Sequence, residues 1–148
     1  MPLSRAVRHA SQVITFDADA RRLTSGELTG FFDGWPAAPD AVGLLRILQS
    51  SSLAVVARDD DRVVGFINAL SDGEFAVYIP LLEVRPSHRG RGIGSQLVQQ
   101  VLDHFPNAYL VDAVCDPEVV PFYERLGMIR LAGMARRNRG SPTLRPVE

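Results

Sequence analysis

The sequence predicts one mixed α/β (α+β) domain, with a mostly antiparallel sheet of about six or seven strands, a parallel central pair of strands and about four flanking helices. Three observations predict this fold. An apolar strand is joined to an amphipathic helix by a glycine-rich loop, strands linked by tight turns precede it, and another apolar strand follows the helix. With 148 residues, 46% of them hydrophobic, the chain can bury one core. We expect a single domain over 1–148, with loose ends at 1–10 and 140–148.

The first third of the chain is predicted to hold a strand and two helices. The strand covers Gln12–Phe16. A T-x-x-E capping box at Thr24–Glu27 then predicts a helix that continues through Phe32 and ends at the Gly-Trp-Pro sequence after it. A second helix begins near Asp40, with apolar residues on its inner face (Val42, Leu44, Leu45 and Leu48).

Three consecutive strands should form an antiparallel meander. Leu53–Arg58 and Arg62–Leu70 are joined by an acidic turn, which favours a hairpin. Asp72 and Gly73 form a D-G turn of the kind found in hairpins, and this turn leads into the third strand. That strand, Tyr78–Val84, is almost continuously apolar, which is typical of a strand covered on both faces.

The central strand and the chain after it predict the parallel pair. Pro80 has no N–H for the ladder, so the strand should bulge or separate from a neighbour there. A helix follows at 93–105, and Ala108–Cys115 is another apolar strand. Because a strand, a helix and a strand in one sheet imply parallel neighbours, these two strands should lie side by side.

The last part of the chain predicts a short helix and one or two closing strands. Pro117 suits a helix start, but Pro121 would remove a hydrogen bond one turn later, so the helix is short or starts late. Gly127 suits its C-terminal end. Met128–Arg137 is expected to supply the closing strands.

The loop before the long helix has the features of an anion site. It runs from Arg89 to Ser95 as R-G-R-G-I-G-S. Its alternating glycines leave backbone N–H groups accessible at a helix N-terminus, where the macrodipole is positive, and its arginines, with Arg85 upstream, add charge suited to a pyrophosphate. The glycine register is not that of a dinucleotide fingerprint, and the chain has no lysine for a phosphate-binding Walker loop.

Two blocks of the sequence resemble the GNAT superfamily of acyl-CoA-dependent N-acyltransferases. The family loop reads Q/R-x-x-G-x-G/A after a strand ending in L-x-V-x-P. Arg89, Gly92 and Gly94 match the loop, and Leu82, Val84 and Pro86 match the strand. The segment from Phe122 to Met128, F-Y-E-R-L-G-M, resembles the family's F-Y-E-K-L-G-F. A glycine-rich loop that only turns the chain is the alternative interpretation.

The resemblance implies acetyl-CoA as co-substrate and no metal. It implies a central strand that diverges from its parallel neighbour, so that backbone groups of the strand bind the pantetheine arm. The residues expected to bind acetyl-CoA are Leu82, Val84, Arg89, Gly90, Arg91, Gly92, Ile93, Gly94 and Ser95. Tyr123 falls at the position of the family's acid, which protonates the leaving thiolate. A tyrosine that only packs its ring is the alternative.

Two carboxylates are candidates for the base that deprotonates the amine. Glu83 lies in the central strand and points to the face opposite Leu82 and Val84, and Asp112 lies in the neighbouring strand. A carboxylate in a buried strand costs free energy unless it is paired or has a function, so ion pairs with arginines are the alternative interpretation for both residues, and water is the alternative base. For the acceptor, the resemblance implies the segment with Phe32, Asp33 and Trp35. The phenylalanine is alternatively a core residue.

We therefore expect an acetyl-CoA-dependent N-acetyltransferase acting on a small-molecule amine. The alternatives are a catalytically silent acyl-CoA sensor and a protein N-terminal or lysine acetyltransferase. The net charge of −1 gives no sign of nucleic-acid binding, and the C-terminal arginines (Arg136, Arg137, Arg139 and Arg145) suggest it only weakly. The sequence has no apolar run for a membrane span and no signal peptide, which predicts a cytoplasmic protein, monomer or homodimer. The single Cys115 cannot form an internal disulfide.

Overall fold

A computed structural model describes residues 13–140, and within them a six-stranded mixed sheet forms the centre of the domain. This confirms the predicted fold class. The strands are β1 (Ile14–Asp17), β2 (Leu53–Asp59), β3 (Arg62–Ser71), β4 (Ala76–Ile79), β5 (Leu82–Val84) and β6 (Leu110–Ala113). The helices are α1 (Ala41–Ser50), α2 (Ile93–His104) and α3 (Val120–Glu124), with short 3₁₀ helices η1 (Ala20–Arg22), η2 (Ser25–Leu28), η3 (Pro86–His88) and η4 (Pro117–Val119). The described residues do not include Gln12 or the loose end predicted for 1–10. Of the loose end predicted for 140–148, they include only Gly140.

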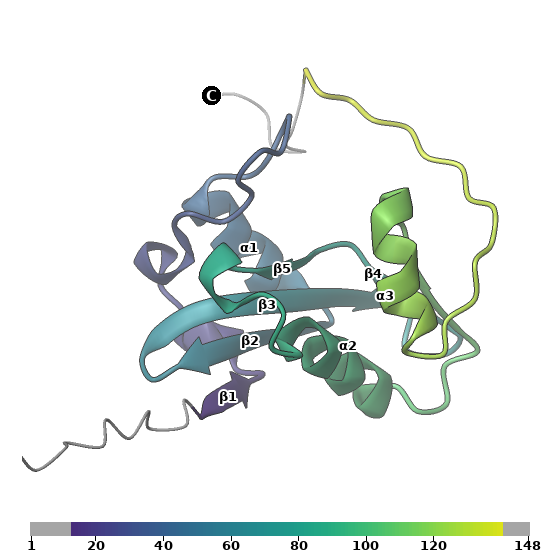
Figure 1. Cartoon of the computed structure of the whole chain (residues 1–148), viewed down its shortest axis with the longest axis horizontal. Coiled ribbons are helices and arrows are strands. Elements are labelled where there is room, and N and C mark those ends of the chain that lie inside the picture. Colours follow the sequence, from purple (N-terminus) through teal and green to yellow (C-terminus); the bar gives the residue numbers. More distant parts are fainter. Residues whose placement is uncertain (1–12, 141–148) are drawn as a thin grey trace, which may run out of the picture.

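The sheet is buried on both faces where the long helices cover it. Alternate residues of β2 show this: Val55 packs with α2 in one core cluster, whereas Val56 packs with α1 in the other. Figure 1 shows α2 in front of the sheet and the fainter α1 behind it. Leu44 and Leu48 are buried on the inner face of α1 as predicted, and Leu45 packs against the same cluster. Val42, also predicted to face inward, is 46% exposed. The two apolar clusters therefore hold β2 and β3 rigidly between the helices.

The predicted break at Pro80 divides the central strand in two. The sheet order is β1-β2-β3-β4-β6, with β5 paired to β3 outside this path. β4 pairs in parallel with β6. β5 pairs antiparallel with β3 and, in the described residues, has no strand on its other side. The sheet thus opens between β5 and β6, just after Pro80.

A buried amide stabilises this opening. Asn68 of β3 is 1% exposed. Its Oδ1 accepts a hydrogen bond from the Leu81 N–H at 3.0 Å, and its Nδ2 donates to Ser51 Oγ at 3.1 Å. Ser51 in turn donates to the carbonyl of Ile47 in α1 at 2.6 Å. The side chain of Asn68 therefore supplies the hydrogen bond that the interrupted ladder would otherwise lack.

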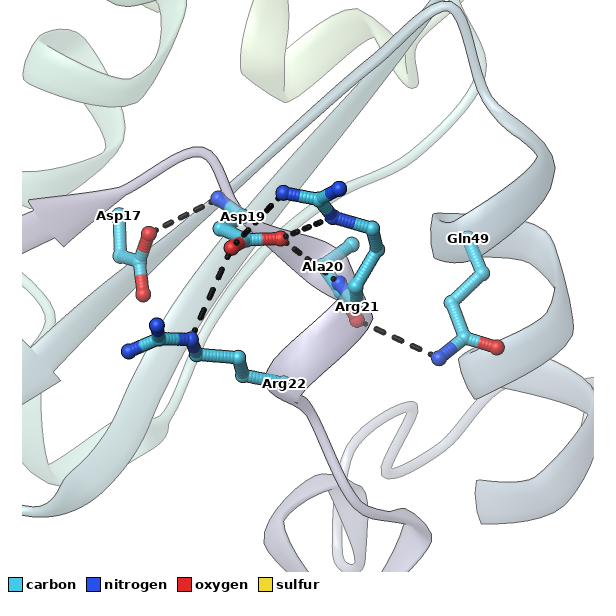
Figure 2. A network of polar contacts seen from close by, with 6 residues as sticks. All are labelled: Asp17, Asp19, Ala20, Arg21, Arg22 and Gln49. Atoms are coloured by element: carbon cyan, nitrogen blue, oxygen red, sulfur yellow. Dashed lines mark hydrogen bonds and ion pairs between the residues drawn. The ribbon is translucent and has the colours of Figure 1, made fainter.

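A surface network fixes the chain between β1 and α1 (Figure 2). The Asp19 carboxylate accepts hydrogen bonds from the backbone and side chain of Arg21, at 3.2 and 3.0 Å, and lies 3.8 Å from Arg22 Nε. Gln49 of α1 donates to the carbonyl of Ala20 at 3.3 Å. The arginine side chains are largely exposed, so these ion pairs contribute little to stability and mainly order η1.

Two predicted elements are wrong. The capping box at Thr24 forms, with Glu27 Oε2 accepting the Thr24 N–H at 2.8 Å, but only a 3₁₀ turn follows. Thr29 is extended and Phe32 has a left-handed φ of 67°, because the chain folds back to pack Phe32 on Phe66.

The closing strands predicted for Met128–Arg137 do not form in the described residues, and the parallel pair therefore lies at the end of the sheet. The segment after α3 runs away from the sheet (Figure 1, yellow). By contrast, the short, late helix predicted around Pro121 is confirmed in α3.

Candidate active site

The predicted anion loop lies at the N-terminus of α2. Gly92, its N-cap, has a φ of 79°, and Gly90 has a φ of 77°. No atom lies within 4 Å of the place where a Cβ would stand at either glycine. The first N–H groups of the helix have no intrahelical partners, and the helix dipole is positive there. Because the space beside both glycines is open at this helix N-terminus, the loop fits the pyrophosphate of a nucleotide cofactor.

Gly94 has a different role from the other two glycines. A Cβ at this position would lie 3.5 Å from ring carbons of Phe122 in α3 and 3.9 Å from Cγ2 of Val84 in β5. The residue thus lets α2 pack closely on α3 and on β5. Ile93 beside it is buried in the core, and Ser95 is half-buried in the same first turn.

The arginines around the loop are used in different ways. Arg89 donates from Nε to the carbonyl of Val84 at 3.0 Å, while its exposed guanidinium lies 3.8 Å from Glu83. Arg91 is exposed. Arg85, expected to add charge to the anion site, instead turns inward, donates to the carbonyl of Val63 at 2.7 Å and stacks 4.1 Å over Phe31.

The open edge of β5 presents the backbone groups of Leu82 and Val84. In the antiparallel pairing with β3, Arg85 donates to Val64 and Leu81 accepts from Asn68. Because residues of an antiparallel strand alternate in the direction of their backbone groups, Leu82 and Val84 direct theirs away from β3. Apart from the Val84 carbonyl, which Arg89 uses, this edge is available to an extended, amide-containing ligand.

Tyr123 lies in α3 on the same side of the sheet as α2. Its ring packs on Phe122, with the centroids 4.9 Å apart, and against the α2-side core. Burial, together with smaller contributions from the nearby Cys115 and Tyr78, raises the pKa of Tyr123 to about 12. The hydroxyl therefore stays protonated at neutral pH and can donate a proton.

Glu83 lies on the opposite face of the sheet, as strand alternation predicts. Its side chain is 11% exposed. Burial raises the pKa of Glu83, while the charge of Arg89 and a hydrogen bond from Trp35 act in the other direction. A buried carboxylate with a raised pKa is a suitable proton acceptor for an amine. This side chain joins the loop residue Arg89 to the segment predicted to bind the acceptor.

The remaining predicted residues are less closely grouped. Phe32 is buried against Phe66 and Trp35, whereas Asp33 is exposed and Trp35 is 44% exposed. Asp112 lies beside Tyr78 in the β4–β6 pair, but it is exposed, because its side chain lies on the face of β6 opposite the α2-side core. No hydrogen bond or ion pair joins it to Glu83 in the described part of the chain.

Sequence reasoning missed two polar groups that support this site. Asn68 holds the break in the sheet, and an amide in an otherwise apolar strand was the available signal. His88, whose position just before the glycines of the loop predicts a phosphate-side or solvated residue, is buried instead. Its Nε2 lies 2.8 Å from Asp59 Oδ2 and its Nδ1 2.7 Å from Ser87 Oγ. It thereby fixes η3, just before the glycine loop, to the end of β2.

The sequence model of the acetyltransferase (GNAT) family matches residues 20–128. The chain belongs to this family. It is 28% identical over 102 residues to the uncharacterized N-acetyltransferase ycf52 of Porphyra purpurea, which covers 66% of this chain and 59% of the relative. It is 32% identical over 97 residues to N-alpha-acetyltransferase 30 of Schizosaccharomyces pombe, covering 60% of this chain and 65% of that one. The chain thus spans less than two thirds of the length of these curated relatives.

Solved structures agree with the GNAT assignment. A Deinococcus radiodurans R1 structure, described as a candidate acetyltransferase, is 44% identical with a TM-score of 0.85, over 90% of this chain and 94% of its own. The GNAT family acetyltransferase SP0256 of Streptococcus pneumoniae TIGR4 is 28% identical with a TM-score of 0.72, over 86% and 99%. Members of this family generally use acetyl-CoA, which is consistent with the open glycine loop and strand edge.

Two negative findings apply to residues 13–140. No three His, Cys, Asp or Glu side chains there are grouped to hold a metal ion. None of the helices in that range has both the length and the apolar composition needed to cross a bilayer. Two surface hollows of the described residues, one near the β3–β4 turn and one between η1 and α1, contain none of the predicted site residues.

Proposed function

We propose that this GNAT protein transfers the acetyl group of acetyl-CoA to the primary amine of a small molecule, by direct attack of the amine on the thioester. One observation carries the proposal. The open edge of β5 lies beside the first turn of α2, where a Cβ at Gly94 would be 3.9 Å from Val84, Tyr123 packs on the α2 side of the sheet, and Glu83, 11% exposed, lies on the other face of β5. These are the groups that aminolysis of a CoA thioester needs.

The residues divide the reaction between the two faces. The amides around Gly92 hold the pyrophosphate, and the backbone of Leu82 and Val84 pairs with the pantetheine amides. The amine nitrogen attacks the thioester carbonyl carbon and the C–S bond breaks. Glu83 accepts the proton that the amine loses, directly or through a water. Tyr123 donates its proton to the departing sulfur.

The acceptor segment favours a small amine with an apolar part. Trp35 is exposed, is edge-on to Phe32 at 4.9 Å and lies close enough to Glu83 to act against the rise in the pKa of that carboxyl, so it lies beside the proposed base. Its ring offers a surface for an apolar body, and the exposed Asp33 offers charge for an ammonium group. A second candidate is the α-amino group of a peptide, which the similarity to an N-alpha-acetyltransferase supports.

The test is release of free CoA from acetyl-CoA, measured across a panel of small primary amines and short peptides with free N-termini. We expect turnover with apolar small amines and a strong loss of turnover in Tyr123→Phe. Turnover with peptides alone would transfer the assignment to the second candidate. Acetyl-CoA binding without turnover on any amine would instead support the silent sensor and refute the proposal.

A further inference from the structure

The segment after α3 is an apolar arm that contacts little of its own domain. Its large side chains are among the most exposed in the described chain: Ile129 is 78%, Leu131 73% and Met134 99% exposed. No hydrogen bond connects the backbone of residues 129–139 to the rest of the described molecule. Figure 1 shows this arm leaving the domain beyond α3. Such an exposed apolar segment marks an interaction surface.

The same molecule also leaves one side of its sheet uncovered. In the described residues, β6 pairs only with β4, so the backbone groups on its outer side have no strand partner. The face of β4 and β6 that lies on the α1 side is also open, because α1 covers β2 and β3 only, and Tyr78 and its β3 neighbour Leu70 are exposed there. An exposed sheet edge is a template for pairing with another strand.

The residue pattern of the arm matches that of β6. In β6, Val111 and Ala113 face the α2-side core, and Asp112 between them is exposed on the opposite face. In the arm, Ile129 and Leu131 flank Arg130. If the arm lies beside β6 as a strand, its two apolar residues extend the α2-side core and Arg130 lies on the side of Asp112. The match in both polarity and charge favours this register.

We propose that residues 128–135 pair as a strand with β6 of a second copy of this chain, whose own arm pairs with β6 of the first. The arm and the β6 edge are complementary and belong to the same chain. A two-fold axis between two copies therefore pairs each arm with the β6 edge of the other copy. A second copy is the occupant because the arm of the chain itself runs away from its own β6 and leaves that edge uncovered. The exchange gives Asp112 an arginine partner from the other copy, beside the acceptor side of the opening.

The test uses disulfide trapping in the full chain with Cys115→Ser, which removes its single thiol. One copy carries Asp112→Cys and the other Arg130→Cys, and the two are co-expressed, purified together, oxidised and run on a non-reducing gel. Met128→Cys and Ala132→Cys lie on the same face of the arm as Arg130→Cys and replace it in parallel experiments. They detect a pairing that is shifted along β6 by two residues in either direction. Asn138→Cys, farther along the arm, is the matched control. The chain with both Asp112→Cys and Arg130→Cys reports pairing within one copy.

The exchange predicts a covalent species of twice the monomer mass from the mixed copies, and none with Asn138→Cys. Light scattering should show a dimer, with Leu131→Asp weakening the dimer by about tenfold or more, since it places a charge in the shared core. A cross-linked monomer from the double variant, without cross-linking between copies, would mean that the arm closes its own sheet. A monomer that forms neither cross-link would also overturn the proposal.

Discussion

The left-handed Gly92 at the start of α2 allows the cofactor site to be tested apart from stability. In Gly92→Ala the φ of 79° becomes unfavourable by about 1–2 kcal/mol, because an L-residue crowds its own backbone in this region. The new Cβ meets no protein atom within 4 Å, so the fold should persist. The methyl group would stand where the pyrophosphate approaches. Loss of one charge-assisted hydrogen bond, about 1.5–3 kcal/mol, weakens acetyl-CoA binding by about 10- to 150-fold.

Gly73 provides the matched control. It also has a φ of 79° with no atom within 4 Å of a Cβ, but it lies in the turn before β4, at the opposite end of that strand from the opening. Gly73→Ala should therefore lower the melting temperature as Gly92→Ala does, by about 2–8 °C, yet bind acetyl-CoA normally. Calorimetric titration of both variants with acetyl-CoA measures whether only Gly92→Ala weakens binding. Equal affinities for acetyl-CoA in the two variants would refute the assignment of the loop.

Three further substitutions test the roles of the remaining residues. Tyr123→Phe should bind acetyl-CoA normally but lower kcat by about 10- to 1000-fold, since the protonated hydroxyl is lost, and an unchanged kcat would reduce Tyr123 to packing. Burial raises the pKa of Glu83, so kcat/KM should rise with pH through a value above that of an ordinary glutamate, as the carboxyl loses its proton. Glu83→Gln should lose both this acidic limb and most of the activity, and survival of the limb would assign the proton to another group. Trp35→Ala should raise KM for the amine by at least about 2- to 12-fold, because an aromatic contact contributes about 0.5–1.5 kcal/mol. The effect on KM for acetyl-CoA should be smaller. Equal effects on both KM values would mean that the acceptor binds elsewhere.

The sequence predicted the local structure of the glycine loop and of the central strand because neighbouring residues determine it, whereas acetyl-CoA binding there stays a prediction. Alternating glycines before an amphipathic helix predict a turn with positive φ angles at the helix start, and Gly90 and Gly92 have them. Pro80 lacks an N–H, so a break in the ladder followed directly from its position in the strand. The alternation of a β-strand was enough to place Glu83 opposite Leu82 and Val84. Each of these predictions needed only a few neighbouring residues.

The predictions that failed depended on residues far apart in the chain. A capping box at Thr24 starts a helix, but the packing of Phe32 on Phe66 ends it after one turn. Arg85 and His88 look like phosphate ligands beside the loop, yet Val63 and Asp59 bind them from β3 and β2. The closing strands predicted for Met128–Arg137 need a partner edge, which cannot be read from a local pattern.

The opening beside β5 has a consequence for how this protein can change. Leu82 and Val84 offer main-chain groups to the edge, and their side chains pack under α2. Under the proposed function, substitution of either side chain would alter packing but not the hydrogen-bonding pattern that the cofactor meets, and only proline would remove a donor. The acceptor side relies on side chains such as Trp35 and Asp33. New amine specificities are therefore accessible by mutation or design at these positions without loss of the common acetyl donor.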